Sequence, residues 1–167
     1  MKKGGKMNAR RPDAYDIALY FLFRAKELGA GDTISNLKMQ KMLYYAQGHY
    51  LALFDEPLFN DEIQAWRYGP VVKKVYDKFS LYKDLSIDFK ELENYDNKVY
   101  NEQHLDFLPF IFNKYNSFSA WELAHKTHSE EPYLKNFSHY NTNEIPQEQI
   151  KAFFKKELSK KNKEYMR

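Results

Sequence analysis

Cysteine is absent from the 167 residues of the chain. Disulfide bonds and thiolate metal sites are therefore excluded, and nothing in the sequence asks for an oxidising compartment. Glycine and proline are scarce, with 6 of each, which is too few for the many turns of an all-β sandwich. Helices joined by a modest number of loops fit this composition better.

Long apolar runs are missing as well. The longest, from Ile17 to Phe23, is far shorter than the ~20 residues that a transmembrane helix needs. The basic N-terminal stretch leads into no signal-peptide core, so we expect a cytoplasmic protein without a membrane partner. Apolar residues still make up 43% of the chain and aromatics 17%, ample material for a core. The sequence predicts a mainly α fold: one compact helical domain with at most one small β-hairpin, around residues 57–68.

Positive charge gathers at the two ends of the chain. Residues 1–11 carry five basic groups and no acidic group, and residues 151–167 have a net charge of +5. The whole chain has a net charge of +3, which leaves −7 for residues 12–150. An acidic body is not typical of a DNA-binding domain, so the pattern favours a protein partner over nucleic acid. A nucleic-acid-binding regulator that works through its basic ends remains an alternative.

Apolar residues at three- and four-residue spacing predict the helices. Asp13 and the pair Ser119 and Glu122 are N-terminal capping signals, and Gly29 is a C-terminal one. We expect helices over residues 13–29, 32 or 33 to 54, 71–81, 102–115, 119–127 and 146–160. We divide the chain into a basic flexible arm (1–12), a single domain (13–160) that includes a C-terminal amphipathic helix (146–160), and a tail (161–167).

The second predicted helix has an unusual apolar face. Two amides, Gln40 and Gln47, fall in the middle of the apolar arc rather than opposite it. Such amides need hydrogen-bond partners when they are buried, so we expect a central helix of a bundle with both amides buried and bonded. Lys38, Lys41 and Tyr45 fall on the other side of the helix and are expected to be exposed.

Motifs of catalysis are absent: there is no phosphate-binding glycine loop, nucleophile elbow or His-Glu-x-x-His helix. His125 and His128 share a helix face, but no convincing third ligand for Zn²⁺ accompanies them. We therefore predict no enzyme and no cofactor, and a metal-dependent enzyme built on these two histidines is a second alternative. The last helix either docks its apolar side on the core or uses its lysines to hold an acidic partner or RNA.

Three segments of the chain, taken in this order, match a known sequence pattern. They are Asp16–Leu22, the stretch Leu37-Lys38-Met39-Gln40-Lys41-Met42-Leu43-Tyr44, and the box Trp66-Arg67-Tyr68-Gly69-Pro70-Val71. Over roughly residues 13–135 the chain resembles the Panacea domain family, in which leucine is usual at positions 39 and 42. The resemblance implies an antitoxin that neutralises a toxin encoded beside it by direct binding. In the SocA-like branch it implies an adaptor that delivers the toxin to a AAA+ protease.

Within the matched segments we separate two groups of residues. Contacts with a partner are expected at Lys38, Lys41, Tyr45, Arg67 and His128; for Lys41 and Arg67, pairing with a carboxylate of the chain itself is the alternative. A structural role is expected for the remaining motif residues, namely Leu37, Gln40, Leu43, Tyr44, Gln47, Trp66, Tyr68, Gly69, Pro70 and Val71.

Overall fold

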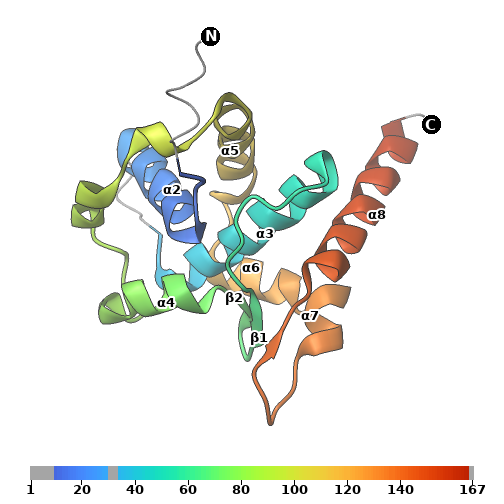
Figure 1. The fold of residues 1–167 in the computed structure, drawn as a ribbon. Coiled ribbons are helices and arrows are strands. Elements are labelled where there is room, and N and C mark those ends of the chain that lie inside the picture. Colours follow the sequence, from blue (N-terminus) through green and yellow to red (C-terminus); the bar gives the residue numbers. More distant parts are fainter. Residues whose placement is uncertain (1–9, 30–33, 166–167) are drawn as a thin grey trace.

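The structure, a computed structural model, describes residues 10–29 and 34–165. Helices dominate it, as predicted, and the strands form a single small sheet (Figure 1). The longer helices are α2 (Ala14–Leu28), α3 (Asn36–Phe54), α5 (Glu102–Tyr115) and α8 (Gln147–Tyr165). The shorter ones are α4 (Lys73–Phe79), α6 (Ala120–Thr127) and α7 (Glu131–Asn136). No helix in these ranges is both long enough and apolar enough to span a membrane.

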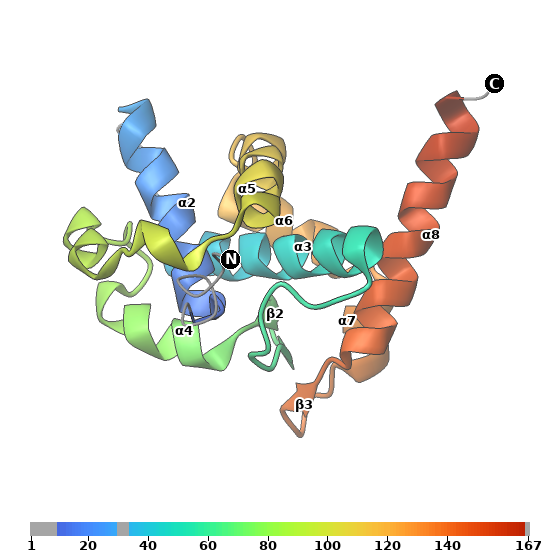
Figure 2. The ribbon, with the colours of Figure 1, turned by 45° about the horizontal axis from the view of Figure 1, so that its top comes forward.

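Helix α3 runs through the centre of the molecule. Helices α2, α4, α5, α6 and α8 and strand β2 pack against it, and Figures 1 and 2 show it crossed by its neighbours on several sides. Its side chains are buried on every face from Met39 to Ala52. A helix with no solvent-facing side cannot show a strong amphipathic pattern, and this explains why its apolar arc is interrupted by polar residues.

The helix boundaries follow the predicted capping signals. Asp13 caps α2 with a reciprocal capping box to Asp16, and Gly29 ends that helix in the left-handed conformation, with φ of 65°. Ser119 and Glu122 form the expected capping box of α6. The predicted start of the second helix at Asp32 or Thr33 lies outside the described residues; the structure caps α3 with Ser35.

The sheet has strand order β2-β1-β3 and is antiparallel throughout. Strands β1 (Gln64–Trp66) and β2 (Gly69–Val71) form the predicted hairpin, shifted toward the C-terminus, and β3 (Asn143–Glu144) joins from far along the chain. We expected a helix to begin at residue 71, and that start was wrong because the chain is still part of β2 there, directly after Pro70. Pro70 lies opposite Ala65 on β2, an edge strand where a residue without an N–H group is tolerated, and α4 begins only at Lys73.

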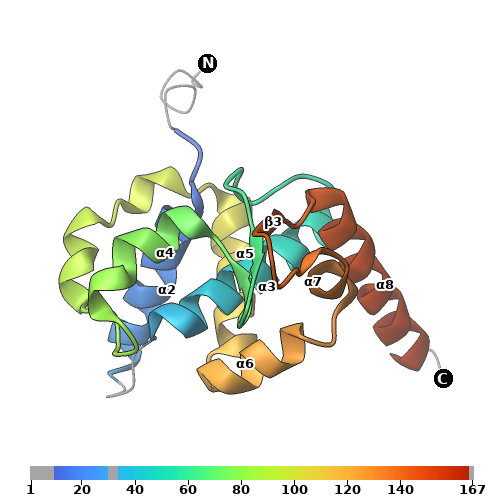
Figure 3. The ribbon, with the colours of Figure 1, turned by 90° about the horizontal axis from the view of Figure 1, so that it is seen from below.

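Residues 80–101 form short 3₁₀ helices, η1 (Ser80–Tyr82), η2 (Phe89–Asn94) and η3 (Asn97–Val99). They cover α2: Tyr15 donates a hydrogen bond to Glu91 at 3.0 Å, and Phe23 stacks on Tyr95. The C-terminal part departs from expectation in two ways. Helix α7 was not predicted, and α8 continues beyond residue 160. Figure 3 shows α7 and α8 together beside the sheet.

Candidate functional site

Two polar side chains of α3, Gln40 and Gln47, tie it to the segments around it. Gln47 accepts hydrogen bonds from the Leu58 and Phe59 N–H groups and donates one to the Phe59 carbonyl at 2.7 Å. Gln40 accepts from the Val72 N–H at 2.9 Å and donates to Asn36. Gln40 and Gln47 are both buried, so the prediction for them is confirmed. They fix the course of the chain into and out of the hairpin.

Lys41 is fully buried, with none of its surface exposed, so the prediction of an exposed lysine was wrong. Its Nζ donates to the Pro70 carbonyl at 3.0 Å. Burial lowers the pKa of the amine to about 7. The side chain passes under Gly69, where a Cβ would lie 2.6 Å from Lys41 Cε and 2.7 Å from Thr127 Oγ1. Gly69 also has φ of 112°, so both the space and the backbone require glycine.

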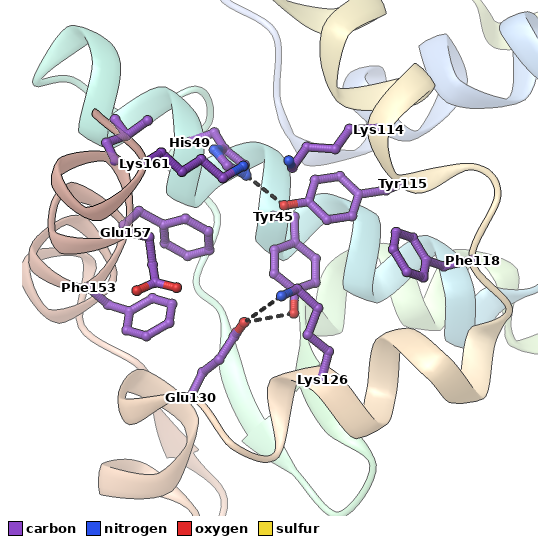
Figure 4. A pocket seen from close by; sticks show the side chains of 12 residues that line it. Tyr45, His49, Lys114, Tyr115, Phe118, Lys126, Glu130, Phe153, Glu157 and Lys161 are labelled. Carbon is purple, nitrogen blue, oxygen red and sulfur yellow. Dashed lines mark hydrogen bonds and ion pairs between the residues drawn. The ribbon is translucent and has the colours of Figure 1, made fainter. Parts of the chain in front are cut away.

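Tyr45 is buried too, which again contradicts the expected exposure. Its ring stacks on Tyr115 with 4.5 Å between centroids, and its hydroxyl donates to Glu130 at 3.0 Å. Burial raises the pKa of the Glu130 carboxyl to about 7. His49, one turn further along α3, contacts the Tyr115 hydroxyl through Nε2 at 2.6 Å. Figure 4 shows these side chains converging from α3, from α5 and from the turn between α6 and α7.

The loop between β1 and β2 and the first turn of α6 together present a different surface, which we call the turn surface: Arg67, Tyr68 and Trp121. All three residues are exposed, Tyr68 by 47% and Trp121 by 63%. The two rings meet edge to face at 5.5 Å, and the Arg67 guanidinium lies over the Tyr68 ring. The sequence analysis did not single out Trp121. It placed Tyr68 among the structural residues, and that role stays a prediction for a side chain that is partly exposed.

Tyr133 and His128 contact the backbone carbonyls beneath the turn surface. The Tyr133 hydroxyl donates to the Trp66 and Arg67 carbonyls, at 2.7 and 3.2 Å. The His128 ring also contacts the Arg67 carbonyl, at 3.1 Å from Nε2. His128 is thus half-buried and supports the loop from behind. A cavity of about 510 Å³ lies beside this surface, lined in part by Leu37 and Trp66.

The remaining site residues predicted from the sequence range from buried to half-buried. Lys38 is half-buried at the start of α3, and its Nζ donates to the Asn116 carbonyl at 2.6 Å. Leu43, Tyr44, Gly69, Pro70 and Val71 are buried, while Leu37 and Trp66 are half-buried. Within residues 10–29 and 34–165, no three His, Asp or Glu side chains come together as a metal site. His125 is exposed and gains no ligand partner from the fold.

Two neighbouring cavities, which together we call the groove, lie over the C-terminal half of α3 beside α5, and α8 forms a wall of one of them. One cavity of about 260 Å³ is lined by His49, Lys114, Lys126 and Lys161 among others (Figure 4). A second, of about 600 Å³, is lined by Leu53, Phe54, Phe107 and Phe110 among others. Burial and the three lysines lower the pKa of His49 to about 3, so its imidazole is neutral at pH 7. Lys114, Lys126 and Lys161 thus bring three amines to the α8 end of the groove, where Glu130 and Glu157 also line the cavity.

The chain resembles a known protein over part of its length. No solved structure matches the chain. A 68-residue segment is 43% identical to the protein described as antitoxin SocA of Caulobacter vibrioides (strain NA1000 / CB15N). This alignment covers 41% of the chain and 35% of the relative, so the chain matches only about a third of that protein's length.

The sequence model of one family extends over more of the chain. It matches residues 39–134, which run from the first turn of α3 to the middle of α7 and include the hairpin, the turn surface and one wall of the groove. The match covers more than half of the sequence. The chain therefore belongs to the antitoxin SocA-like, Panacea domain family.

Proposed function

We propose that this protein neutralises a toxin encoded beside it by binding the toxin directly, without catalysing a reaction. Membership of an antitoxin family supplies the general role. The observation that carries the binding step is the turn surface, where Arg67, Tyr68 and Trp121 form an exposed and preorganised cluster. Tryptophan, tyrosine and arginine are the residues in which binding energy concentrates at protein interfaces.

The contacts beneath the turn surface strengthen its assignment as the toxin-binding site. The backbone carbonyls under the cluster are held by Tyr133 and His128, so the loop loses little conformational freedom when a partner binds. Exposed apolar side chains mark interaction sites when they are contiguous rather than scattered, and the Tyr68 and Trp121 rings are in contact with each other. Lys41 and Tyr45, in contrast, are buried in the free protein and act in this proposal by shaping the loop and the core.

The test is co-expression of the neighbouring reading frame with the wild-type protein and with Arg67→Ala, Tyr68→Ala and Trp121→Ala. We expect the wild type to rescue growth and to form a complex with the toxin. Each substitution should weaken the complex by at least tenfold. Leu28→Ala, at an exposed apolar residue on the last turn of α2, is the matched control, and circular dichroism checks that every variant folds.

Two measurements separate the possible mechanisms. Toxin abundance during rescue distinguishes occlusion, where toxin persists in the complex, from delivery to a AAA+ protease, where toxin is depleted. Gel shifts with DNA and RNA at several salt concentrations test the regulator alternative, because phosphate contacts weaken steeply with salt. A neighbouring product that is harmless on its own would overturn the proposal, as would rescue with neither a complex nor loss of the toxin.

A further inference from the structure

The groove over α3 consists of two neighbouring cavities, which share no lining residue. His49 and Leu53 are one turn apart on α3, and Phe110 and Lys114 are one turn apart on α5. One member of each pair lines each cavity. The His49 and Phe110 rings meet at 6.2 Å between the cavities. The two cavities therefore lie about one helical turn apart along the same two helices, with α8 as a further wall at the Lys161 end.

One end of the groove is apolar and open. Phe110 is 51% exposed, Leu53 47% and Phe54 37%. These side chains come from α3 and α5 and line a single cavity of about 600 Å³. Contiguous exposed apolar side chains mark interaction sites more often than scattered ones do. Glu102 and Asp106 of α5 line the same cavity.

The other end of the groove is basic. The Lys114 and Lys161 side chains extend toward each other from α5 and α8 (Figure 4). Within the described residues, neither forms an ion pair. The neighbouring Lys161 ammonium group lowers the pKa of Lys114 to about 8. Lys126 adds a third positive charge, only loosely paired with Glu130 at 4.0 Å, and Glu157 nearby is engaged by Lys160 at 3.2 Å.

We infer that this groove receives an amphipathic helix of the neutralised toxin, with its apolar side on Leu53, Phe54 and Phe110 and an acidic side chain between Lys114 and Lys161. Proteins commonly bind a partner's amphipathic helix by holding its apolar face in a hydrophobic groove. A carboxylate between the two lysines would relieve their mutual repulsion. The inference rests on the proposed function, because it names the segment of the toxin that is bound.

Charge argues against an occupant from the chain itself. The N-terminal residues 1–9 contain Lys2, Lys3 and Lys6 and no acidic side chain, so they would be repelled from the basic end. The groove also lies close to the turn surface in the fold, because α6 supplies Trp121 to one and Lys126 to the other. One partner that spans α6 can contact both.

The experiment uses the full chain in complex with the toxin. The double substitution Lys114→Glu and Lys161→Glu should weaken the complex by at least tenfold and reduce the salt dependence of the affinity. A control of equal charge change, Lys90→Glu with Lys98→Glu, alters exposed lysines of η2 and η3 and should leave the affinity within twofold. Reversing the charge of the contacted acid on the toxin should restore binding to the Lys114/Lys161 variant.

A photo-crosslinking amino acid at position 110 identifies the occupant. We expect a crosslink to a helical segment of the toxin that carries an acidic residue about one turn from its apolar residues. If wild-type complex forms but gives no such crosslink, or if the Lys114/Lys161 variant binds normally, the inference is overturned. A crosslink to a second copy of this chain overturns it as well. If the wild type forms no complex at all, the proposed function itself has failed, and that result is distinct from the others.

Discussion

The ring of Phe154 on α8 occupies the space that a side chain at Gly48 on α3 would need. A Cβ built on Gly48 would lie 2.6 Å from Phe154 Cζ and closer still to two other ring carbons. Phe154 is buried and packs against Tyr44, Tyr45 and His49. The absence of a side chain at position 48 thus permits the closest approach between the central helix and the C-terminal one.

Gly48→Ala should therefore displace α8. We expect the free energy of unfolding to fall by about 1–3 kcal/mol, the usual cost of overpacking, even though alanine is the better helix former. Urea denaturation measures the loss. Limited trypsin digestion should cut the lysine-rich helix α8 sooner than in the wild type.

A double-mutant cycle checks the cause of that effect. Phe154→Ala alone should cost about 3–5 kcal/mol, as for other buried phenylalanines. With Phe154→Ala already present, Gly48→Ala should cost nothing further, because the clash is gone. Additive effects of the two substitutions would show that the ring is not what excludes a side chain at position 48.

Gln47→Leu should reduce the free energy of unfolding by about 1–3 kcal/mol, because it leaves the Leu58 and Phe59 N–H groups and the Phe59 carbonyl without their partner. Asn113→Leu replaces an exposed amide on α5 and should change stability by less than about 0.5 kcal/mol. Equal stabilities for the Gln47 variant and the wild type in urea would mean that these backbone groups find water instead.

Glu130 should make stability depend on pH in a defined window. Its pKa is about 7 in the folded protein and 4.5 is its ordinary value, so the folded state holds the proton more tightly. Its contribution is complete below pH 4.5 and is lost as the pH rises to 7, by at most about 3 kcal/mol. Glu130→Gln keeps an oxygen for the Tyr45 hydroxyl and should remove this dependence. Parallel pH profiles of the two proteins between pH 4.5 and 7 would contradict the assignment.

Lys41 should act in the opposite direction and at higher pH. Its folded pKa of about 7 lies below the ordinary 10.5, so the unfolded state binds the proton more tightly. Stability should rise between pH 7 and 10 relative to Lys41→Met, by up to about 5 kcal/mol. Since the amine is inaccessible, the Met variant should still rescue cells from the toxin. Loss of rescue in a folded Met variant would restore Lys41 to the list of partner contacts.

Local signals in the sequence were sufficient for much of the fold. Asp13, Gly29 and Ser119 mark helix ends through bonds to residues three or four positions away, and such short-range effects can be inferred without tertiary structure. The burial of Gln40 and Gln47 was also predictable, since both lie inside an apolar arc. The resemblance that identified the family also depended on short stretches of sequence, one of which contains Gln40.

The incorrect predictions concern residues whose burial depends on segments that are distant in the sequence. Tyr45 and Lys41 were assigned to an outer side of α3, but α6, α8 and the hairpin enclose that side. No pattern within residues 34–54 reveals that enclosure. Strand β3 pairs with β1 across some 80 residues of chain, and Trp121 reaches Tyr68 across some 50. The turn surface and the groove are likewise formed by contacts between separate elements, so their positions could not be derived from spacing alone.

The position of Phe154 also has a consequence for the boundaries of the folding unit. The family signature ends at residue 134, yet Phe154 and Ile150 of α8 belong to the buried core. A chain cut to residues 39–134 would expose the rings of Tyr44 and Tyr45 and would also lack α2. Such a fragment would tend to aggregate, and its failure to bind a toxin would say nothing about the interface. The smallest piece that folds should include α2 and the first half of α8.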